Sequence, residues 1–196
     1  IRAANATITV EADDGELCVL APPVRLGQAL AHIIVNAISA QGDPPVREPE
    51  VTIQTQRSGD IVELRVRDNG LGIDPQILPR VFDPFVTTRE VGEGAGLGLS
   101  LAHSVLTSAE GSLEVERTGP EGTTFLLRLQ VAELGDDDES GADERPIEVK
   151  GASALVTAAD PRVGEAIAKM LRRYVASVQN VPLSGARTLL AEKAFD

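Results

Sequence analysis

The chain has 196 residues, of which 42% are hydrophobic and only 3% aromatic, so its core is predicted to be aliphatic. The formal net charge of −12 argues against nucleic-acid binding, because that binding depends mainly on lysine and arginine side chains that contact phosphates. No apolar stretch reaches the roughly 18 to 20 residues of a membrane span, and no secretory signal opens the chain. Because its only cysteine, Cys18, also fits a reducing compartment, we expect a cytoplasmic segment, whose parent protein could be membrane-anchored elsewhere.

The first part of the chain predicts two strands and a helix. Residues 6–20 favour two short strands around a "DDGE" turn, and residues 22–42 a helix that begins at two prolines and ends at Gly42. The helix has an apolar stripe formed by Leu26, Leu30, Ile33, Ile34 and Ala37. Its opposite face carries Arg25, Gln28, His32, Asn36 and Ser39. Such a face usually meets solvent, but Asn36 is flanked by apolar residues, and its amide oxygen is a hard ligand of the kind that Mg²⁺ requires.

Residues 50–70 are predicted to form a hairpin whose second strand ends in an unexpected carboxylate. The apolar residues of "IVELRV" alternate, and the period of two places Asp68 on the same inward face. A buried carboxylate needs a hydrogen-bond donor, and the exocyclic amine of adenine is one. Gly70 and Gly72 lack side chains, so a flat ring could lie against the backbone there. An ordinary Asp-Asn-Gly turn after a strand gives the same pattern.

Residues 74–96 are rich in glycine and proline and are predicted to form mostly loop. A second helix is expected over residues 96–111, followed by strands over residues 112–118 and 122–132. Gly94, Gly96 and Gly98 alternate just before the helix. Glycine N–H groups and a helix N-terminus together favour phosphate, although a glycine run can also be a flexible connector.

The order of these motifs resembles the GHKL superfamily, and specifically the catalytic ATP-binding domain of bacterial sensor histidine kinases. The motifs are the polar helix face with "NA", then "DNGLGI", "VFDPFVTTR", "GAGLGLSLA" and "EGTTFLLRL". The resemblance covers about residues 1–131. It implies an α/β fold of the Bergerat type, a two-layer sandwich in which helices cover one face of a mixed sheet. It also implies ATP and Mg²⁺ as ligands beneath a mobile lid.

The same resemblance assigns roles to individual residues. It implies that Asn36 ligates Mg²⁺, that Asp68 contacts adenine and that Arg89 faces the phosphates. It implies that Phe82 and Phe85 anchor the lid. The other residues implied in nucleotide binding are Gly70, Gly72, Ile73, Thr88, Gly94, Ala95, Gly96, Leu97, Gly98, Leu99 and Thr123.

The sequence departs from the family pattern at two positions of the first helix. His32 stands where histidine kinases mostly carry Asn and where the ATP-hydrolysing relatives carry a Glu that positions water. A neutral histidine can accept a proton, so we include His32 with Asn36 and Arg89 among the catalytic candidates. Ser39 stands where many kinases have Lys, so neutralisation of the phosphates is expected to depend on Mg²⁺, Arg89 and glycine amides. His103 is predicted to be an ordinary surface residue.

The resemblance implies a protein-histidine kinase domain that presents Mg-ATP to a histidine. The phosphoacceptor is expected on a dimerisation domain that normally precedes this one, in a homodimer that passes the phosphoryl group to a response regulator or receiver domain. Two alternatives stay open. One is a GHKL-type ATPase that drives a conformational change, and the other is a nucleotide-sensing module without catalysis.

The last third of the chain differs in composition. Residues 132–150 are predicted to be an acidic linker, since "ELGDDDESGADE" has seven acidic residues in twelve. Residues 151–196 predict strand, helix, strand and helix, and resemble the start of a flavodoxin-like receiver domain. Receivers bind Mg²⁺ through two acidic residues where this chain has Ala158 and Ala159, so the resemblance implies a partial, degenerate pseudo-receiver. Because about 45 residues bury little surface alone, we expect this segment either to pack against the first domain or another copy, or to be partly disordered.

A basic and aromatic cluster follows the helix of this last segment. Arg172, Arg173 and Tyr174 could bind a cyclic dinucleotide through stacking and phosphate contacts. A basic helix end, which the helix dipole favours, accounts for the same residues.

Overall fold

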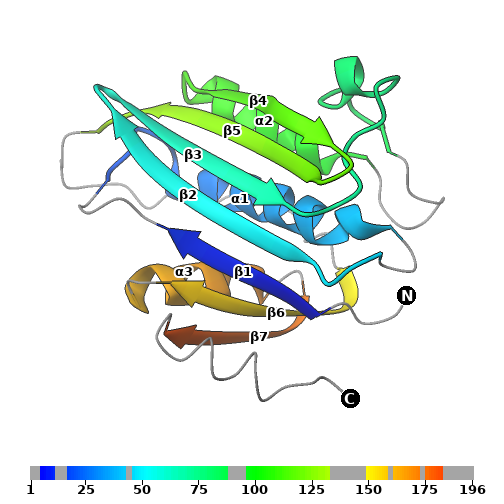
Figure 1. Cartoon of the computed structure of the whole chain (residues 1–196). Helices are drawn as coiled ribbons and strands as arrows, with labels where there is room; N and C mark the ends of the chain where they lie inside the picture. Colours follow the sequence, from blue (N-terminus) through cyan, green and yellow to red (C-terminus); the bar gives the residue numbers. More distant parts are fainter. Residues whose placement is uncertain are drawn as a thin grey trace.

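The computed structural model describes residues 5–11, 17–42, 46–87, 96–132, 149–158, 161–172 and 175–182. Within these ranges one mixed sheet of seven strands has the order β4-β5-β3-β2-β1-β6-β7. Its parallel pairs are β1–β2, β1–β6 and β6–β7, and the other neighbours are antiparallel. The three α-helices lie on one face of the sheet (Figure 1). The predicted two-layer arrangement is therefore confirmed.

The helix α1 (Pro23–Ile38) begins and ends where the sequence predicts. A proline occupies its first turn, and a short 3-10 helix, η1 (Ser39–Gln41), extends it to Gly42, whose φ of 79° ends the helical conformation. Ile33, Ile34 and Ala37 of the apolar stripe are buried against the sheet, while Leu26 and Leu30 are partly buried. This aliphatic contact fixes which side of α1 faces away from the core.

The predicted hairpin is formed by β2 (Glu50–Ser58) and β3 (Ile61–Asp68), which turn at Gly59 with a φ of 64°. Val51 pairs with Asp68 at the open end of the hairpin. Val62, Val66 and Asp68 are all buried, as the period of two predicts. The chain therefore places a carboxylate on the helix-covered face of the sheet.

A second hairpin lies beside the first and closes this edge of the sheet. It consists of β4 (Ser112–Gly119) and β5 (Gly122–Gln130), and it follows α2 (Gly98–Ser108) directly. Phe125 of β5 is fully buried in the core cluster that also contains Ala102 and Leu106 of α2. The register shifts between Val115 and Arg117, so both Glu116 and Arg117 lie outside the strict alternation of β4.

The second short strand predicted within residues 17–20 is wrong. β1 (Asn5–Glu11) forms as predicted, but the later residues make only an isolated bridge between Val19 and Val131. The N–H of Leu20 donates to the Gln130 carbonyl, and the N–H of Ala132 donates to the Cys18 carbonyl. The pairing ends there because Pro22 and Pro23, which follow at once, have no N–H group and α1 begins.

The last described segment continues the same sheet. It consists of β6 (Val149–Ala158), α3 (Pro161–Leu171) and β7 (Val175–Pro182), and β6 pairs in parallel with β1. Met170 of α3 packs against Ala31 and Val35 of α1. The expected packing against the first domain is confirmed, whereas the receiver likeness and the division at residues 131 and 150 stay predictions.

Several earlier predictions fall on residues outside these ranges. They concern Ala159 beside the expected receiver metal site, the basic and aromatic pair Arg173 and Tyr174, and the final helix. In the described part of the chain no helix is long and apolar enough to cross a bilayer.

Candidate functional site

The carboxyl group of Asp68 is buried at the end of β3, and only one of its two oxygens accepts hydrogen bonds from described residues. Its Oδ1 accepts hydrogen bonds from the N–H groups of Gly70 at 2.8 Å and Thr123 at 3.0 Å. Its Oδ2 is buried and has no partner among the described residues. Burial raises the pKa of Asp68, and the two N–H donors and the charge of Arg67 only partly oppose this shift. An unpartnered buried acceptor is costly, so this oxygen is suited to a ligand that brings a donor.

Gly70 and Gly72 are required by contacts within the protein. A Cβ at Gly70 would lie 2.6 Å from the Ala40 carbonyl oxygen. A Cβ at Gly72, whose φ is 80°, would lie 2.3 Å from the Gly119 carbonyl oxygen. The sequence analysis explained both glycines by space for a flat ring, but the structure gives a different reason. They let the Asp68 loop pack between the end of α1 and the β4–β5 turn.

The side chain of Asn69, next to Asp68, makes hydrogen bonds with η1, with the start of β2 and with the loop that joins them. Its Oδ1 accepts from the Nε2 of Gln41 and from the N–H of Glu50, and its Nδ2 donates to the Glu48 carbonyl. Gln41 is 1% exposed, and its Oε1 has no partner among the described residues. The sequence analysis missed both residues, because Gln41 reads as a helix end and Asn69 as an ordinary turn residue. Together they fix Asp68 relative to α1.

The β4–β5 hairpin forms the other wall around Asp68. Thr123 is buried, and its hydroxyl lies 3.1 Å from that of Thr118. The Thr118 hydroxyl also accepts the N–H of Ile73 at 2.8 Å. At Gly122, a Cβ would lie 2.0 Å from the Asp68 carbonyl oxygen. Thr123 thus contacts Asp68 directly, whereas Ile73 is linked to it through Thr118 and Thr123. Their predicted roles in nucleotide binding stay predictions, and Thr118 gave no signal in the sequence.

The polar face of α1 is only partly exposed to solvent. Arg25 is exposed and Gln28 and Asn36 are half-buried, but His32 is buried. A Cβ at Gly98 would lie 3.5 Å from Nδ1 of His32, so this ring faces the first turn of α2. The Ser39 hydroxyl donates to the Val35 carbonyl of its own helix. The face that carries His32 therefore meets the glycine-rich helix start rather than bulk water.

The "VFDPF" segment is anchored by one phenylalanine. The ring of Phe82 stacks on His103 at 5.1 Å and meets the edge of Phe125 at 6.5 Å. Phe85 is 75% exposed with a φ of 66°, and only its N–H is held, by the Gly96 carbonyl at 3.0 Å. The predicted anchoring is therefore wrong for the Phe85 ring. The prediction for His103 is also wrong, since its half-buried ring supports Phe82.

The glycine-rich segment is described only in part. Leu97 precedes the first turn of α2, Gly98 opens the helix, and Leu99 packs against the core. Gly96 has a φ of 66°, a conformation that favours glycine. Thr88, Arg89, Gly94 and Ala95 lie outside the described residues, so their predicted roles at the phosphates stay predictions.

The described residues hold no group of three or more His, Cys, Asp or Glu side chains that could bind a metal alone. Asn36, which the sequence analysis assigns to Mg²⁺, has only one neutral side-chain oxygen to offer. A Mg²⁺ ion at Asn36 would therefore need further oxygens from a phosphate ligand and water, which is how Mg²⁺ commonly binds with nucleotides.

A family model matches this part of the chain. The family described as histidine kinase-, DNA gyrase B-, and HSP90-like ATPase matches residues 21–133. The matched segment begins just before α1 and ends just after β5. It therefore contains every described residue that surrounds Asp68.

Two curated relatives are similar to more than half of the chain. The two-component sensor PprA of Pseudomonas aeruginosa is 40% identical over 111 residues, which are 55% of this chain and 12% of the relative. The sensor protein FixL of Bradyrhizobium diazoefficiens is 32% identical over 132 residues, which are 67% of this chain and 26% of the relative. The chain thus spans between about an eighth and about a quarter of the length of these relatives.

Solved structures show a similar fold. The catalytic domain of the histidine kinase ThkA has a TM-score of 0.55 at 26% identity, covering 64% of this chain and 78% of that domain. Full-length ShkA, crystallised with AMPPNP, has a TM-score of 0.56 at 22% identity, covering 95% of this chain and 37% of that one. The second match concerns the fold alone, but it extends well beyond the catalytic domain.

Proposed function

Because the chain belongs to the family of histidine kinase-, DNA gyrase B-, and HSP90-like ATPases, we propose that it presents Mg-ATP for phosphoryl transfer to a histidine. Its matched segment is an ATP-binding domain homologous to the catalytic domains of sensor histidine kinases. The acceptor in this proposal is a histidine on a dimerisation domain of a homodimeric parent kinase in the cytoplasm. A response regulator or receiver domain then takes the phosphoryl group.

The unpartnered Oδ2 of Asp68 is the observation that carries this proposal. The exocyclic amine of adenine supplies the donor that this oxygen lacks, in a charge-assisted bond worth about 1.5–3 kcal/mol. Oδ1 is already held by two backbone N–H groups, so the carboxylate cannot turn away. Guanine carries a carbonyl oxygen where adenine has this amine, so the same oxygen selects adenine by repulsion.

Asn36 and the start of α2 serve the phosphate end of the nucleotide. Asn36 offers its amide oxygen to Mg²⁺, which neutralises phosphate charge when it is bound. The N–H groups at the start of α2 offer fixed positive dipoles to the phosphates. His32 lies between the two helices and sets their spacing at this point.

Transfer itself needs little chemistry from these residues. The acceptor imidazole is its own nucleophile, so positioning and charge neutralisation do most of the work. Neither histidine of the chain suits that role, because His32 is buried and His103 is stacked on Phe82. We therefore propose an acceptor on another domain, which distinguishes this proposal from ATP hydrolysis or from nucleotide sensing without transfer.

Radiolabelled ATP tests the proposal in the parent kinase. Asn36→Ala should abolish autophosphorylation while adenosine binding to the 196-residue chain is retained, because Asn36 acts through the metal. Gln28→Ala, on the same half-buried face, is the control and should retain activity. Normal autophosphorylation of Asn36→Ala would contradict the role of Asn36. Rapid release of inorganic phosphate without histidine labelling would favour an ATPase, and nucleotide binding without either product would favour a sensing module.

We further propose that the β6–α3–β7 segment regulates this domain by docking. Two observations support this proposal. Strand β6 pairs in parallel with β1, and Met170 contacts Ala31 and Val35 of α1, the helix that carries Asn36. Deletion of residues 149–196 from the parent kinase should change the autophosphorylation rate, whereas labelling by acetyl phosphate should not occur on this segment. An unchanged rate, or efficient labelling, would contradict regulation by docking. A cyclic dinucleotide at Arg172 and its neighbours stays a prediction.

A further inference from the structure

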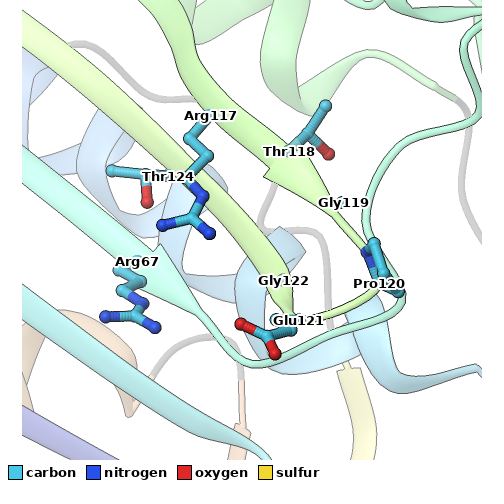
Figure 2. Close-up of a pocket in the computed structure, with 8 residues that line it drawn as sticks. All are labelled: Arg67, Arg117, Thr118, Gly119, Pro120, Glu121, Gly122 and Thr124. Carbon is cyan, nitrogen blue, oxygen red and sulfur yellow. The ribbon is translucent and has the colours of Figure 1, made fainter.

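A hollow lies beside the β4–β5 turn and opens on the helix-free face of the sheet, opposite the face that carries Asp68. It has a volume of about 360 Å³ and is lined by Arg67, Arg117, Thr124 and the β4–β5 turn from Thr118 to Gly122. Figure 2 shows the side chains of Arg67, Arg117 and Glu121 around this space. We call it the outer pocket. Volumes of this size are sufficient for a small ligand.

The strand register explains why two arginines meet there. Arg67 of β3 and Arg117 of β4 both pair with Thr124 of β5, so the three residues form one row across three strands. The bulge between Val115 and Arg117 is what brings Arg117 into this row. Without the extra residue, Glu116 would pair with Thr124 and Arg117 would fall on the opposite face.

These two arginines differ from their neighbours on the same face. Arg65 and Arg128 contact Glu63, Glu114 and Glu116 in a ladder of ion pairs with distances from 2.7 to 3.2 Å. Arg67 and Arg117 make no ion pair within the described ranges. Arg47 adds a further positive charge beside the turn, where it reaches the Pro120 carbonyl at 3.5 Å. Three cations thus gather here in a chain whose net charge is −12.

We propose that Arg67, Arg117 and Thr124 bind a phosphate-type oxyanion in the outer pocket. Guanidinium groups donate paired hydrogen bonds to such oxyanions, and a threonine hydroxyl between them can donate a further bond. Glu121 lies at the opposite side of the hollow and is the one negative charge in its lining. It accepts a hydrogen bond from a hydroxyl group of the ligand and limits the affinity for a fully charged anion.

The outer pocket and the Asp68 site share the β4–β5 turn as a wall. Thr123 donates its N–H to Asp68, and its neighbour Thr124 lines the outer pocket. Arg67 also supports the charge of Asp68, since it lowers the pKa of that carboxyl against the larger effect of burial. An oxyanion on Arg67 opposes this support and weakens adenine binding. This coupling rests on the proposed nucleotide function, whereas oxyanion binding does not.

Nuclear magnetic resonance of the ¹⁵N-labelled 196-residue chain tests the binding. Inorganic phosphate, titrated at constant ionic strength, should shift the amide signals of Arg67, residues 117–119 and residues 121–124. In Arg67→Gln/Arg117→Gln the dissociation constant should rise by about tenfold or more, as expected from the loss of charge-assisted bonds. Arg57→Gln, at the far end of the β2–β3 hairpin, is the matched control for loss of charge and should bind as before.

Glu121→Gln should change the phosphate affinity in the opposite direction from the arginine variant. It removes the negative charge from the lining, so it should lower the dissociation constant by about twofold to fivefold at low salt. Titrations with phenyl phosphate and acetate show which kind of anion the pocket prefers. Binding of phosphate alone indicates a free ion, and binding of phenyl phosphate as well indicates a phosphomonoester. Preference for acetate over both, equal phosphate affinity in the double arginine variant, or shifts centred on residues 96–99 would overturn the proposal.

Adenosine, which has no phosphates, tests the coupling by calorimetry. Saturating phosphate should weaken adenosine binding by about twofold to threefold, and this effect should disappear in Arg67→Gln/Arg117→Gln. Equal adenosine affinity with and without phosphate would overturn the coupling. If adenosine does not bind at all, the proposed nucleotide function fails, while the phosphate shifts at residues 117–124 still decide the outer pocket.

Discussion

Glu63 and Asp68 lie on the same strand, β3, but on opposite faces of the sheet. Glu63 faces outward, and its hydrogen bonds with Arg128 and Arg65 lower its pKa. Asp68 faces the helices, and burial raises its pKa even though two N–H groups and Arg67 oppose the shift. The outward carboxylate is fully partnered, whereas the inward one keeps a buried oxygen without a partner among the described residues. In this strand, the buried oxygen without a partner is the observation that supports the proposed ligand contact of Asp68.

Among the variants that test this comparison, Asp68→Asn should have the largest effect, and it should appear in ATP affinity. The variant keeps the shape of the side chain but replaces the free oxygen with an NH₂ group, which repels the adenine amine. We expect the affinity for ATP to fall by roughly tenfold to a hundredfold, which corresponds to the loss of a charge-assisted hydrogen bond. Calorimetry measures the change, and Asp74→Asn, an exposed carboxylate of the loop, is the control. An unchanged affinity would falsify the assignment of Asp68 to adenine.

The raised pKa of Asp68 predicts that protein stability and adenosine binding change in opposite directions with pH. The folded state keeps this proton to a higher pH than the unfolded state, whose carboxyl has an ordinary value near 3.8. Between these two pKa values, the contribution of Asp68 to the free energy of unfolding falls as the pH rises. Adenosine binding needs the ionised form, so it rises with pH over the same window.

Calorimetric titrations with adenosine and thermal unfolding at several pH values check this prediction. The differences between the wild-type chain and Asp68→Asn isolate the residue from the other carboxylates. Binding that is independent of pH throughout the acid range, or stability and binding that rise together in the difference curves, would show that Asp68 is not the titrating group.

Asn69→Ala tests whether the fixed position of Asp68 depends on its neighbour. The variant leaves Gln41 and the backbone of Glu48 and Glu50 without the amide that now joins them. We expect the free energy of unfolding to fall by about 1–2 kcal/mol, because some of these groups gain water. Urea unfolding measures the loss, with Gln56→Ala, an exposed residue of β2, as the control. Equal losses in both variants would contradict a special role for Asn69.

Local patterns account for most of what could be predicted from the sequence. The alternation of β3 predicts that Asp68 points inward, and the apolar stripe of α1 predicts which of its faces packs on the sheet. The pairing of β1 with β6 joins residues about 150 positions apart, and a parallel pair leaves no turn between its strands for a pattern to reveal. The exposure of Phe85 and the link between Gln41 and Asn69 depend on three-dimensional neighbours, which residue type alone does not encode.

The bulge in β4 is a further feature that could not be predicted from the sequence. Alternation predicts opposite faces for Glu116 and Arg117, but the register shift places Arg117 beside Thr124, while Glu116 still contacts Arg65. A single extra residue in a strand has no composition signal, since both side chains are charged and both suit a solvated face. The outer pocket therefore could not be inferred before the structure was known.

Glu63→Gln should have the smallest effect, because the outward face of β3 is accessible to water. Its partners Arg65 and Arg128 retain side-chain exposures of 27% and 39%. Exposed ion pairs contribute little, so we expect the free energy of unfolding at neutral pH to fall by less than about 1 kcal/mol, and ATP affinity to stay unchanged. The lowered pKa of Glu63 means that its contribution is present above the unfolded value near 4.5 and is lost as the pH falls through the folded one. Urea unfolding of both chains at neutral and acid pH checks this, since the gap between them should close in acid. A loss as large as that of Asn69→Ala, or weaker nucleotide binding, would show that the two faces of β3 are not as independent as their pKa shifts indicate.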